Sequence, residues 1–167
     1  MSIFKLMIAA LLLAVPAAAN VLTFDFHNYQ DVGFDVPWVD QGLTFVIEST
    51  GSTPLAQSLS GGLYLGTNVV TLDLSPLDDV RRVEAEIRTT DETFPTMVAL
   101  FDDVGMVDGV SSADQLRTET LTLLSGGASV HWFRISSSIC RLETINVFYG
   151  PVANDSVTWS SIKALYR

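Results

Sequence analysis

The stretch that decides the fold reads VEAEIR and runs from Val83 to Arg88. Its apolar residues Val83, Ala85 and Ile87 alternate with charged residues, so an apolar side chain recurs at every second position. Successive side chains of a β-strand point to opposite faces of its sheet, whereas a helix needs a period of about 3.6 residues. The stretch therefore predicts a strand with one face in a core and the other in water.

Similar runs recur along most of the chain. Those that alternate or are rich in β-branched and aromatic residues are Val21–Phe26, Leu43–Ile47, Val70–Leu74, Met97–Phe101, Thr118–Leu123, Val130–Ile135, Leu142–Tyr149 and Val157–Tyr166. Turn residues such as Ser60-Gly61-Gly62 and Gly150-Pro151 separate them. About nine or ten short strands with this spacing predict an all-β fold, an antiparallel β-sandwich or barrel, in a single domain over residues 20–167.

Residues 1–19 have a different character. Lys5 precedes an apolar run from Leu6 to Val15, and Ala17-Ala18-Ala19 supplies a site of small residues before Asn20. This order is typical of a secretory signal peptide, so we expect cleavage after Ala19 and a secreted or periplasmic protein. Because a membrane-spanning helix needs about 20 apolar residues, we expect no membrane association after cleavage.

The charge balance limits the partners. Nine Lys and Arg residues face nineteen Asp and Glu residues, a formal net charge of −10. Phosphate backbones are bound by clustered basic side chains, so we do not expect a nucleic-acid partner. Cys140 is the only cysteine, which excludes an intramolecular disulfide. An exported acidic domain without disulfides makes Ca²⁺ a candidate structural ion.

Several segments resemble exported bacterial jelly-roll domains. They are VLTFDF at Val21–Phe26, GLTF at Gly42–Phe45, SGGLYLGT at Ser60–Thr67, and the closing LETINVFY and SIKALY. The resemblance is to galactose-binding-like and carbohydrate-binding-module-like sandwiches and to surface proteins with a PEP-CTERM sorting signal. It implies a jelly roll whose family members often bind glycans or calcium. The sequence ends at Arg167 without that signal, so we expect free secretion or periplasmic residence instead of a surface anchor.

Motifs for catalysis are missing from the sequence. It has no GxSxG, HExxH, phosphate-binding glycine loop or CxxC. Two histidines, His27 and His131, cannot make a three-ligand zinc site without carboxylates, and His131 beside aromatic residues suggests a structural role. We therefore expect a non-catalytic binding module. A structural or adhesive extracellular protein and a glycan-acting hydrolase with a carboxylate pair are the alternatives.

The long segment His27–Gly42 combines aromatic and acidic residues. Tyr29 and Trp38 could stack on the C–H faces of a sugar, while Asp40 could accept hydrogen bonds from its hydroxyls. The candidate calcium ligands are Asp31, Asp35 and Asp155, because carboxylates in loops suit Ca²⁺. Alternatively, Phe34 and Trp38 plug one end of the sandwich and the aspartates only solvate the loop.

The number of strands between two loops predicts whether the loops lie at the same end of the sandwich. If neighbouring strands run in opposite directions, the loops at 27–42, 89–95, 125–129 and 150–155 emerge at the same end, which places Asp155 near the first loop. This count treats the acidic segment Asp102–Gln115 as a connection between strands, with a second weak calcium loop as the less favoured interpretation. The grouping depends on every strand having been recognised.

A second aromatic candidate lies near the end of the chain. Trp132 and Arg134 alternate with Phe133 and Ile135. If Phe133 faces the core, Trp132 and Arg134 share an open sheet face, as a sugar-stacking platform requires. The opposite arrangement buries Trp132 and is the commoner outcome in sandwiches. The candidate ligand-binding residues are thus Tyr29, Trp38, Asp40, Trp132 and Arg134, and the expected partner is a glycan or an extracellular matrix component.

Overall fold

The computed structural model describes residues 20–28, 37–49, 57–59, 61–66, 68–89, 95–113, 116–136 and 140–150. These residues form twelve strands and one short 3-10 helix: β1 (Asn20–Asp25), η1 (Phe26–Asn28), β2 (Trp38–Asp40), β3 (Leu43–Ser49), β4 (Gln57–Leu59), β5 (Gly62–Tyr64), β6 (Asn68–Asp73), β7 (Val80–Thr89), β8 (Met97–Phe101), β9 (Met106–Ser111), β10 (Thr118–Leu124), β11 (Trp132–Ser136) and β12 (Cys140–Tyr149). The predicted all-β class is confirmed. Within the described ranges, no helix is long and apolar enough to cross a membrane.

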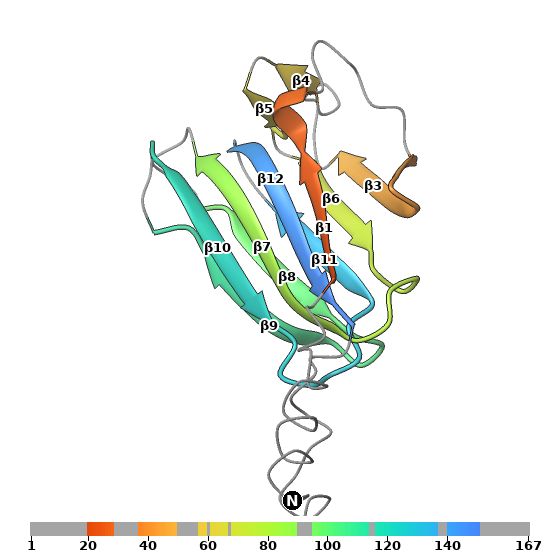
Figure 1. Ribbon diagram of the computed structural model, residues 1–167. Helices are drawn as coiled ribbons and strands as arrows, with labels where there is room; N and C mark the ends of the chain where they lie inside the picture. The colour runs from red at the N-terminus through yellow and green to blue at the C-terminus, as the bar shows by residue number, and fades with distance from the viewer. Residues whose placement is uncertain are drawn as a thin grey trace, which may run out of the picture.

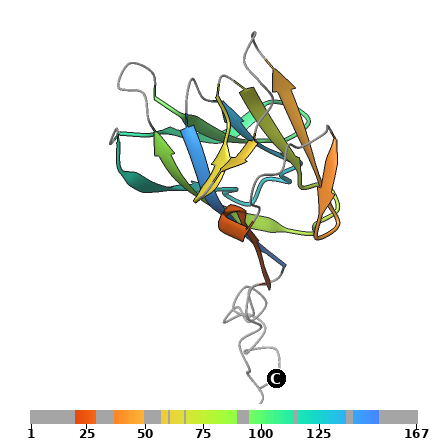
Figure 2. The same ribbon diagram turned by 90° about the horizontal axis from the view of Figure 1, so that it is seen from above.

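The strands form two antiparallel sheets. The first has the order β10-β7-β12-β5-β4, and β1 joins it by pairing with β12. The second has the order β2-β3-β6-β11-β8-β9. Figure 1 shows β10, β7, β12 and β1 side by side in front of β8, β11 and β6, and Figure 2 shows the same strands from above. This arrangement confirms the expected antiparallel β-sandwich of jelly-roll type.

The hydrophobic core lies between the two sheets and follows the alternation read from the sequence. Val83, Ala85 and Ile87 on β7 are fully buried, whereas Glu84 and Glu86 are half-buried on the outer face. Burial of apolar area contributes about 25 cal/mol per Å² and favours this register over one shifted by one residue. The sequence pattern therefore predicted the inner face of this strand correctly.

The acidic segment after β8 contains a strand where the sequence suggested a connection. Met106–Ser111 form β9, which pairs with β8 along the edge of the second sheet. All six residues are half-buried or exposed, so β9 lacks the buried apolar face that makes a strand visible in a sequence. Asp108 Oδ2 accepts a hydrogen bond of 2.8 Å from the Leu124 N–H, which ties β9 to the end of β10.

The additional strand makes the predicted grouping of loops wrong. Along β12, Cys140 lies opposite Thr89, and Phe148 lies opposite Arg82 at the other end of β7. Leu124 at the end of β10 also lies opposite Arg82. The chain therefore leaves β7 at one end of the sandwich but leaves β10 and β12 at the other. One unrecognised strand reverses the direction of every strand that follows it.

Two predicted segments lie outside the described residues. They are the signal peptide at 1–19 and the closing strand at Val157–Tyr166. The proposed boundaries of the mature domain therefore stay predictions.

Candidate functional site

The orientation of β11 decides which side chains reach the open face of the second sheet. Phe133 and Ile135 are 1% and 0% exposed, whereas Trp132 is 37% exposed and Arg134 is half-buried. Val130 is also buried, because the chain at His131 has not yet entered the strand and the alternation starts only at Trp132. Of the two arrangements that the sequence left open, the less common one is present: Trp132 and Arg134 lie together on the outer face.

Neighbouring strands add side chains to this face. Asp73 of β6 and Phe101 of β8 lie opposite Trp132, and Thr71 lies opposite Arg134. A shallow depression of about 300 Å³ is lined by Glu48, Thr71, Phe101, Asp102, Trp132 and Arg134. We call these six residues the Trp132 face. It combines two aromatic rings, one guanidinium group and two carboxylates.

Arg134 is only loosely neutralised by its neighbours. Its Nη2 lies 3.7 Å from Glu48 Oε2, and the two side chains are 43% and 60% exposed. An exposed ion pair at this distance contributes little free energy. Arg134 Nε is buried and has no hydrogen-bond partner within the described part of the chain.

Asp102 at the rim of the Trp132 face is held in a fixed position. Its Oδ1 accepts hydrogen bonds of 2.8 Å from the backbone N–H groups of Val104 and Gly105. These hydrogen bonds favour the charged form and lower the pKa of Asp102 below its usual value. The carboxylate is therefore ionised at neutral pH and stabilises the turn between β8 and β9.

Exposed apolar side chains extend the outer surface of the second sheet beyond the depression. Val39 is 64% exposed, Met106 is 57% exposed and Met97 is 39% exposed. A Cβ atom on Gly109 would lie 3.0 Å from Met106 Sδ and 3.3 Å from Met97 Cε, so both methionines pack over this glycine. Met97 and Met106 are thus neighbours at the β8–β9 edge, whereas Val39 lies at the opposite edge of the sheet on β2.

Trp38 does not belong to the Trp132 face, because its ring packs against core residues. It lies in strand β2, so its predicted position in a loop was wrong. Its ring is half-buried and stacks on Phe45 with centroids 4.0 Å apart and planes 10° apart, and it meets the edge of Phe26 at 6.1 Å. Asp40 ends the same strand and is half-buried. One face of the Trp38 ring is thus covered by core residues, as in the alternative in which it plugs the sandwich.

The remaining candidates cannot be placed. Tyr29, Asp31, Asp35 and Asp155 lie outside the described residues. Among the residues that are described, no three His, Cys, Asp or Glu side chains are grouped so that they could hold a metal ion. The calcium site therefore stays a prediction.

His131 contacts a carboxylate and an aromatic ring, whereas its sequence context suggested only a structural role. Its Nδ1 lies 2.8 Å from Asp103 Oδ1, and its ring meets the edge of Trp132 at 5.5 Å. Its backbone N–H donates to the Phe101 carbonyl, and its carbonyl accepts from the Leu74 N–H, so β8 and β6 fix its position. Asp103 is 28 positions away in the sequence, so no local motif could have indicated the pair.

Comparisons with known proteins find solved structures of low sequence identity. No protein-family model matches the sequence, and no curated protein matches it. Among solved structures, a variant of CBM29-2, a family 29 carbohydrate binding module, is similar at 9% identity and a TM-score of 0.44, over 84% of this chain and 99% of that one. The C-terminal CBM6 of LamC from Zobellia galactanivorans is similar at 10% identity and a TM-score of 0.39, over 77% of this chain and 99% of that one. Similarity at these values carries no argument about function.

Proposed function

We propose that the Trp132 face binds carbohydrate and that the protein is a secreted binding module with no chemistry at this face. The observation that carries the proposal is the outward position of Trp132 beside Arg134, with Phe133 and Ile135 filling the core behind them. An indole held at the surface by a rigid strand is available for stacking without any rearrangement of the fold.

The chemistry of the face suits a sugar. The C–H faces of a pyranose ring stack on aromatic rings, and its hydroxyl groups need both donors and acceptors nearby. Trp132 and Phe101 supply the rings, Arg134 supplies donors, and Glu48 and Asp102 supply acceptors. A neutral sugar is also not repelled by a protein with a net charge of −10.

Glycan-array screening followed by calorimetry tests the proposal. The wild-type protein should bind at least one glycan, and Trp132→Ala should weaken that binding about tenfold or more, since a tenfold change corresponds to about 1.4 kcal/mol. Met97→Ala is a matched control, because Met97 is exposed on the same sheet but does not line the depression. Absence of any glycan binding, or equal weakening in both variants, would contradict the proposal.

An adhesive or structural extracellular role is the second candidate. It is favoured by the exposed side chains of Met97 and Met106, which lie together beyond the depression and would suit a protein surface. A glycan-independent partner that is lost with Met97→Ala and Met106→Ala, but kept with Trp132→Ala, would favour this role over sugar binding.

Export and calcium binding also belong to the proposal. Cleavage after Ala19 would give an exported protein whose measured mass corresponds to a chain that begins at Asn20, and intact Met1 on the exported protein would refute it.

For calcium, Asp31, Asp35 and Asp155 are the proposed ligands. At 100 times its dissociation constant the ion would stabilise the native state by about 2.7 kcal/mol. Equal melting temperatures in millimolar Ca²⁺ and in excess chelator would exclude a structural ion.

A further inference from the structure

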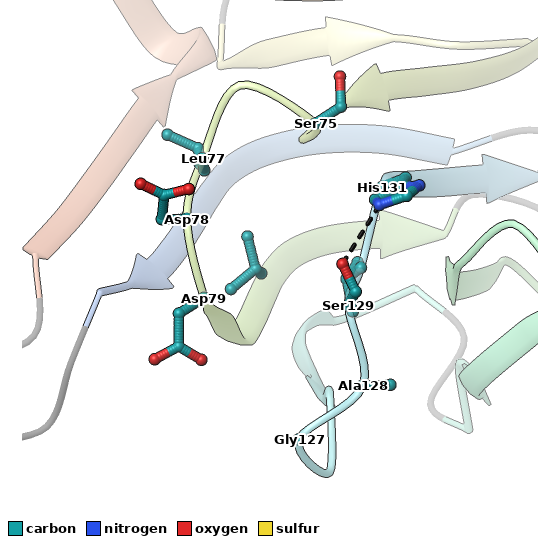
Figure 3. Close-up of a pocket in the computed structure, with 10 residues that line it drawn as sticks. Ser75, Leu77, Asp78, Asp79, Gly127, Ala128, Ser129 and His131 are labelled. Carbon is teal, nitrogen blue, oxygen red and sulfur yellow. Dashed lines mark hydrogen bonds between the residues drawn. The ribbon is translucent and has the colours of Figure 1, made fainter.

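A second cavity lies beside the Trp132 face, between the turn that leads from β6 to β7 and the loop that leads from β10 to β11. Its volume is about 340 Å³. The lining residues are Ser75, Leu77, Asp78, Asp79, Val80, Gly127, Ala128, Ser129, Val130 and His131. Figure 3 shows the two segments facing each other across the cavity, with Ser129 and His131 joined on one side.

Ser129, His131 and Asp103 form a continuous chain of polar contacts at this cavity. Ser129 Oγ lies 3.2 Å from His131 Nε2, and His131 Nδ1 lies 2.8 Å from Asp103 Oδ1. The hydroxyl and the carboxylate therefore meet opposite nitrogens of one imidazole. This is the order of contacts by which a histidine can take a proton from a serine while a carboxylate orients it.

The carboxylate decides the tautomer of the imidazole. An ionised carboxylate can only accept hydrogen bonds, so Nδ1 must carry a proton and donate it to Asp103. In the neutral ring Nε2 then has a free lone pair and accepts from the Ser129 hydroxyl. The neutral ring that donates from Nδ1 to Asp103 is therefore the tautomer in which Nε2 faces the Ser129 hydroxyl as an acceptor, which is the arrangement that a general base toward Ser129 requires.

Two segments carry the three groups: the turn after β8 carries Asp103, and the loop between β10 and β11 carries Ser129 and His131. Asp103 belongs to the turn that the two backbone hydrogen bonds of Asp102 hold in place. The Ala128 N–H donates to the Ser125 carbonyl, which closes the turn just before Ser129. Within the described part of the chain the Ser129 N–H makes no hydrogen bond, so it is available to stabilise an oxyanion formed next to its own side chain.

We propose that Ser129 and His131 are catalytic residues, oriented by Asp103, for hydrolysis of small uncharged carboxylic esters. Ser129 Oγ attacks the acyl carbon as its proton moves to His131 Nε2. The ester C–O bond breaks, the alcohol leaves with that proton, and the acyl group stays on Ser129. Water then attacks the acyl-enzyme with His131 again as the base, which releases the carboxylic acid and restores the serine.

The lining of the cavity restricts the substrate. Val80 and Val130 are buried, so Leu77 and Ala128 are the apolar side chains that a short acyl group could touch in a mainly polar lining. Asp78 would repel an anionic substrate, whereas the charge of Asp79 is paired with Arg81, whose Nη2 lies 2.7 Å from Asp79 Oδ2. Because the Asp103 side chain is 73% exposed, water weakens its interaction with His131, so we expect modest rates. The site does not depend on glycan binding.

This activity departs from the expectation, drawn from the sequence, that the protein is not an enzyme. In proteins that have a GxSxG motif, the nucleophilic serine lies on a turn between a strand and a helix. In this protein Ser129 lies in a loop between two strands, and the motif is absent. A search for that motif could therefore not detect this arrangement.

The test uses the full chain with p-nitrophenyl acetate as substrate and a fluorophosphonate as covalent probe. The wild-type protein should release p-nitrophenol above the buffer rate, and the probe should add to Ser129 as mapped by mass spectrometry. Ser129→Ala should lower kcat at least about 100-fold and abolish the adduct. Ser75→Ala is the matched control, because Ser75 lines the same cavity but donates its hydroxyl to Asp73.

Further variants test the positioning role of Asp103. Asp103→Asn should lower kcat with KM nearly unchanged, and Asp103→Glu should restore part of the rate. No release above buffer, an equal rate in Ser129→Ala with an unchanged melting temperature, or an adduct on another residue would overturn the proposal.

Discussion

Two tryptophans of the same sheet lie on its opposite faces. Trp38 of β2 lies opposite Phe45 of β3, Phe45 lies opposite Leu72 of β6, and Leu72 lies opposite Phe133 of β11. This row faces the core, and its last member is the direct sequence neighbour of Trp132, which faces outward. Being one position along a strand is enough to move an indole from the core to the surface.

The sequence context suggests the reverse placement. Trp38 follows a polar segment rich in aspartate, which is typical of a surface loop, whereas Trp132 sits among Val130, Phe133 and Ile135, which is typical of a core strand. The contrast shows that the phase of the strand ladder decides which side chains reach solvent. Composition of the surrounding segment is a weaker guide than register.

The largest expected effect separates the two tryptophans by stability. Trp38→Ala should lower the free energy of unfolding by about 3 kcal/mol, because it removes a ring stacked on Phe45 and leaves a cavity at the core. Trp132→Ala should change it by about 1 kcal/mol or less, since the ring stands on an open face. Urea unfolding of both variants measures this difference, and equal losses would remove the distinction between the two faces.

A smaller effect is expected for the ion pair on the outer face. Glu48→Gln should change the free energy of unfolding by no more than about 0.5 kcal/mol. The reason is that Glu48 Oε2 and Arg134 Nη2 are 3.7 Å apart and both side chains are substantially exposed. The matched variant is Arg134→Gln, which removes the other partner. The same urea titration measures both variants. If either one lowers the free energy of unfolding by more than about 2 kcal/mol, the ion pair stabilises the fold as much as a core residue does.

The smallest effect concerns pH. The pKa of Asp102 is lowered in the folded protein, so the native carboxylate binds its proton more weakly than the unfolded chain does. Its contribution to stability is therefore complete above the usual pKa of 3.8 and is lost as the pH falls through the lower native value. Asp102→Asn removes this contribution, so the variant should be slightly less stable than the wild type at neutral pH, and the difference should disappear as the pH falls below the native pKa of Asp102. An unaltered acid transition would contradict the assignment.

The sequence predicted the fold better than the site. The inward residues of β7 and the outward glutamates between them were both correct, since burial of a whole apolar row outweighs any single contact. Strand β9 was missed because its six residues have no buried face. Strands β2 and β4, of three residues each, were missed as well, but the omission of β9 between β7 and β10 reversed the later strands and with them the predicted grouping of loops.

The site depended on contacts that no local pattern contains. Trp132 reaches the surface only because the alternation restarts after His131, whose backbone bonds to β8 and β6. His131 meets Asp103 because β8 and β11 are paired, which brings together residues 28 positions apart. Neither the exposure of Trp132 nor the partner of His131 follows from residue type.

By itself, the sequence determined the all-β class, the period of the strands and the residues that fill the core of β7. These depend on side-chain alternation within a few neighbouring residues, and water enforces them whatever the topology. Only the tertiary structure decided which tryptophan is exposed, which loops share an end and which histidine meets a carboxylate. Those outcomes depend on the pairing of strands distant in the sequence, where a change of one strand or one residue reverses the result.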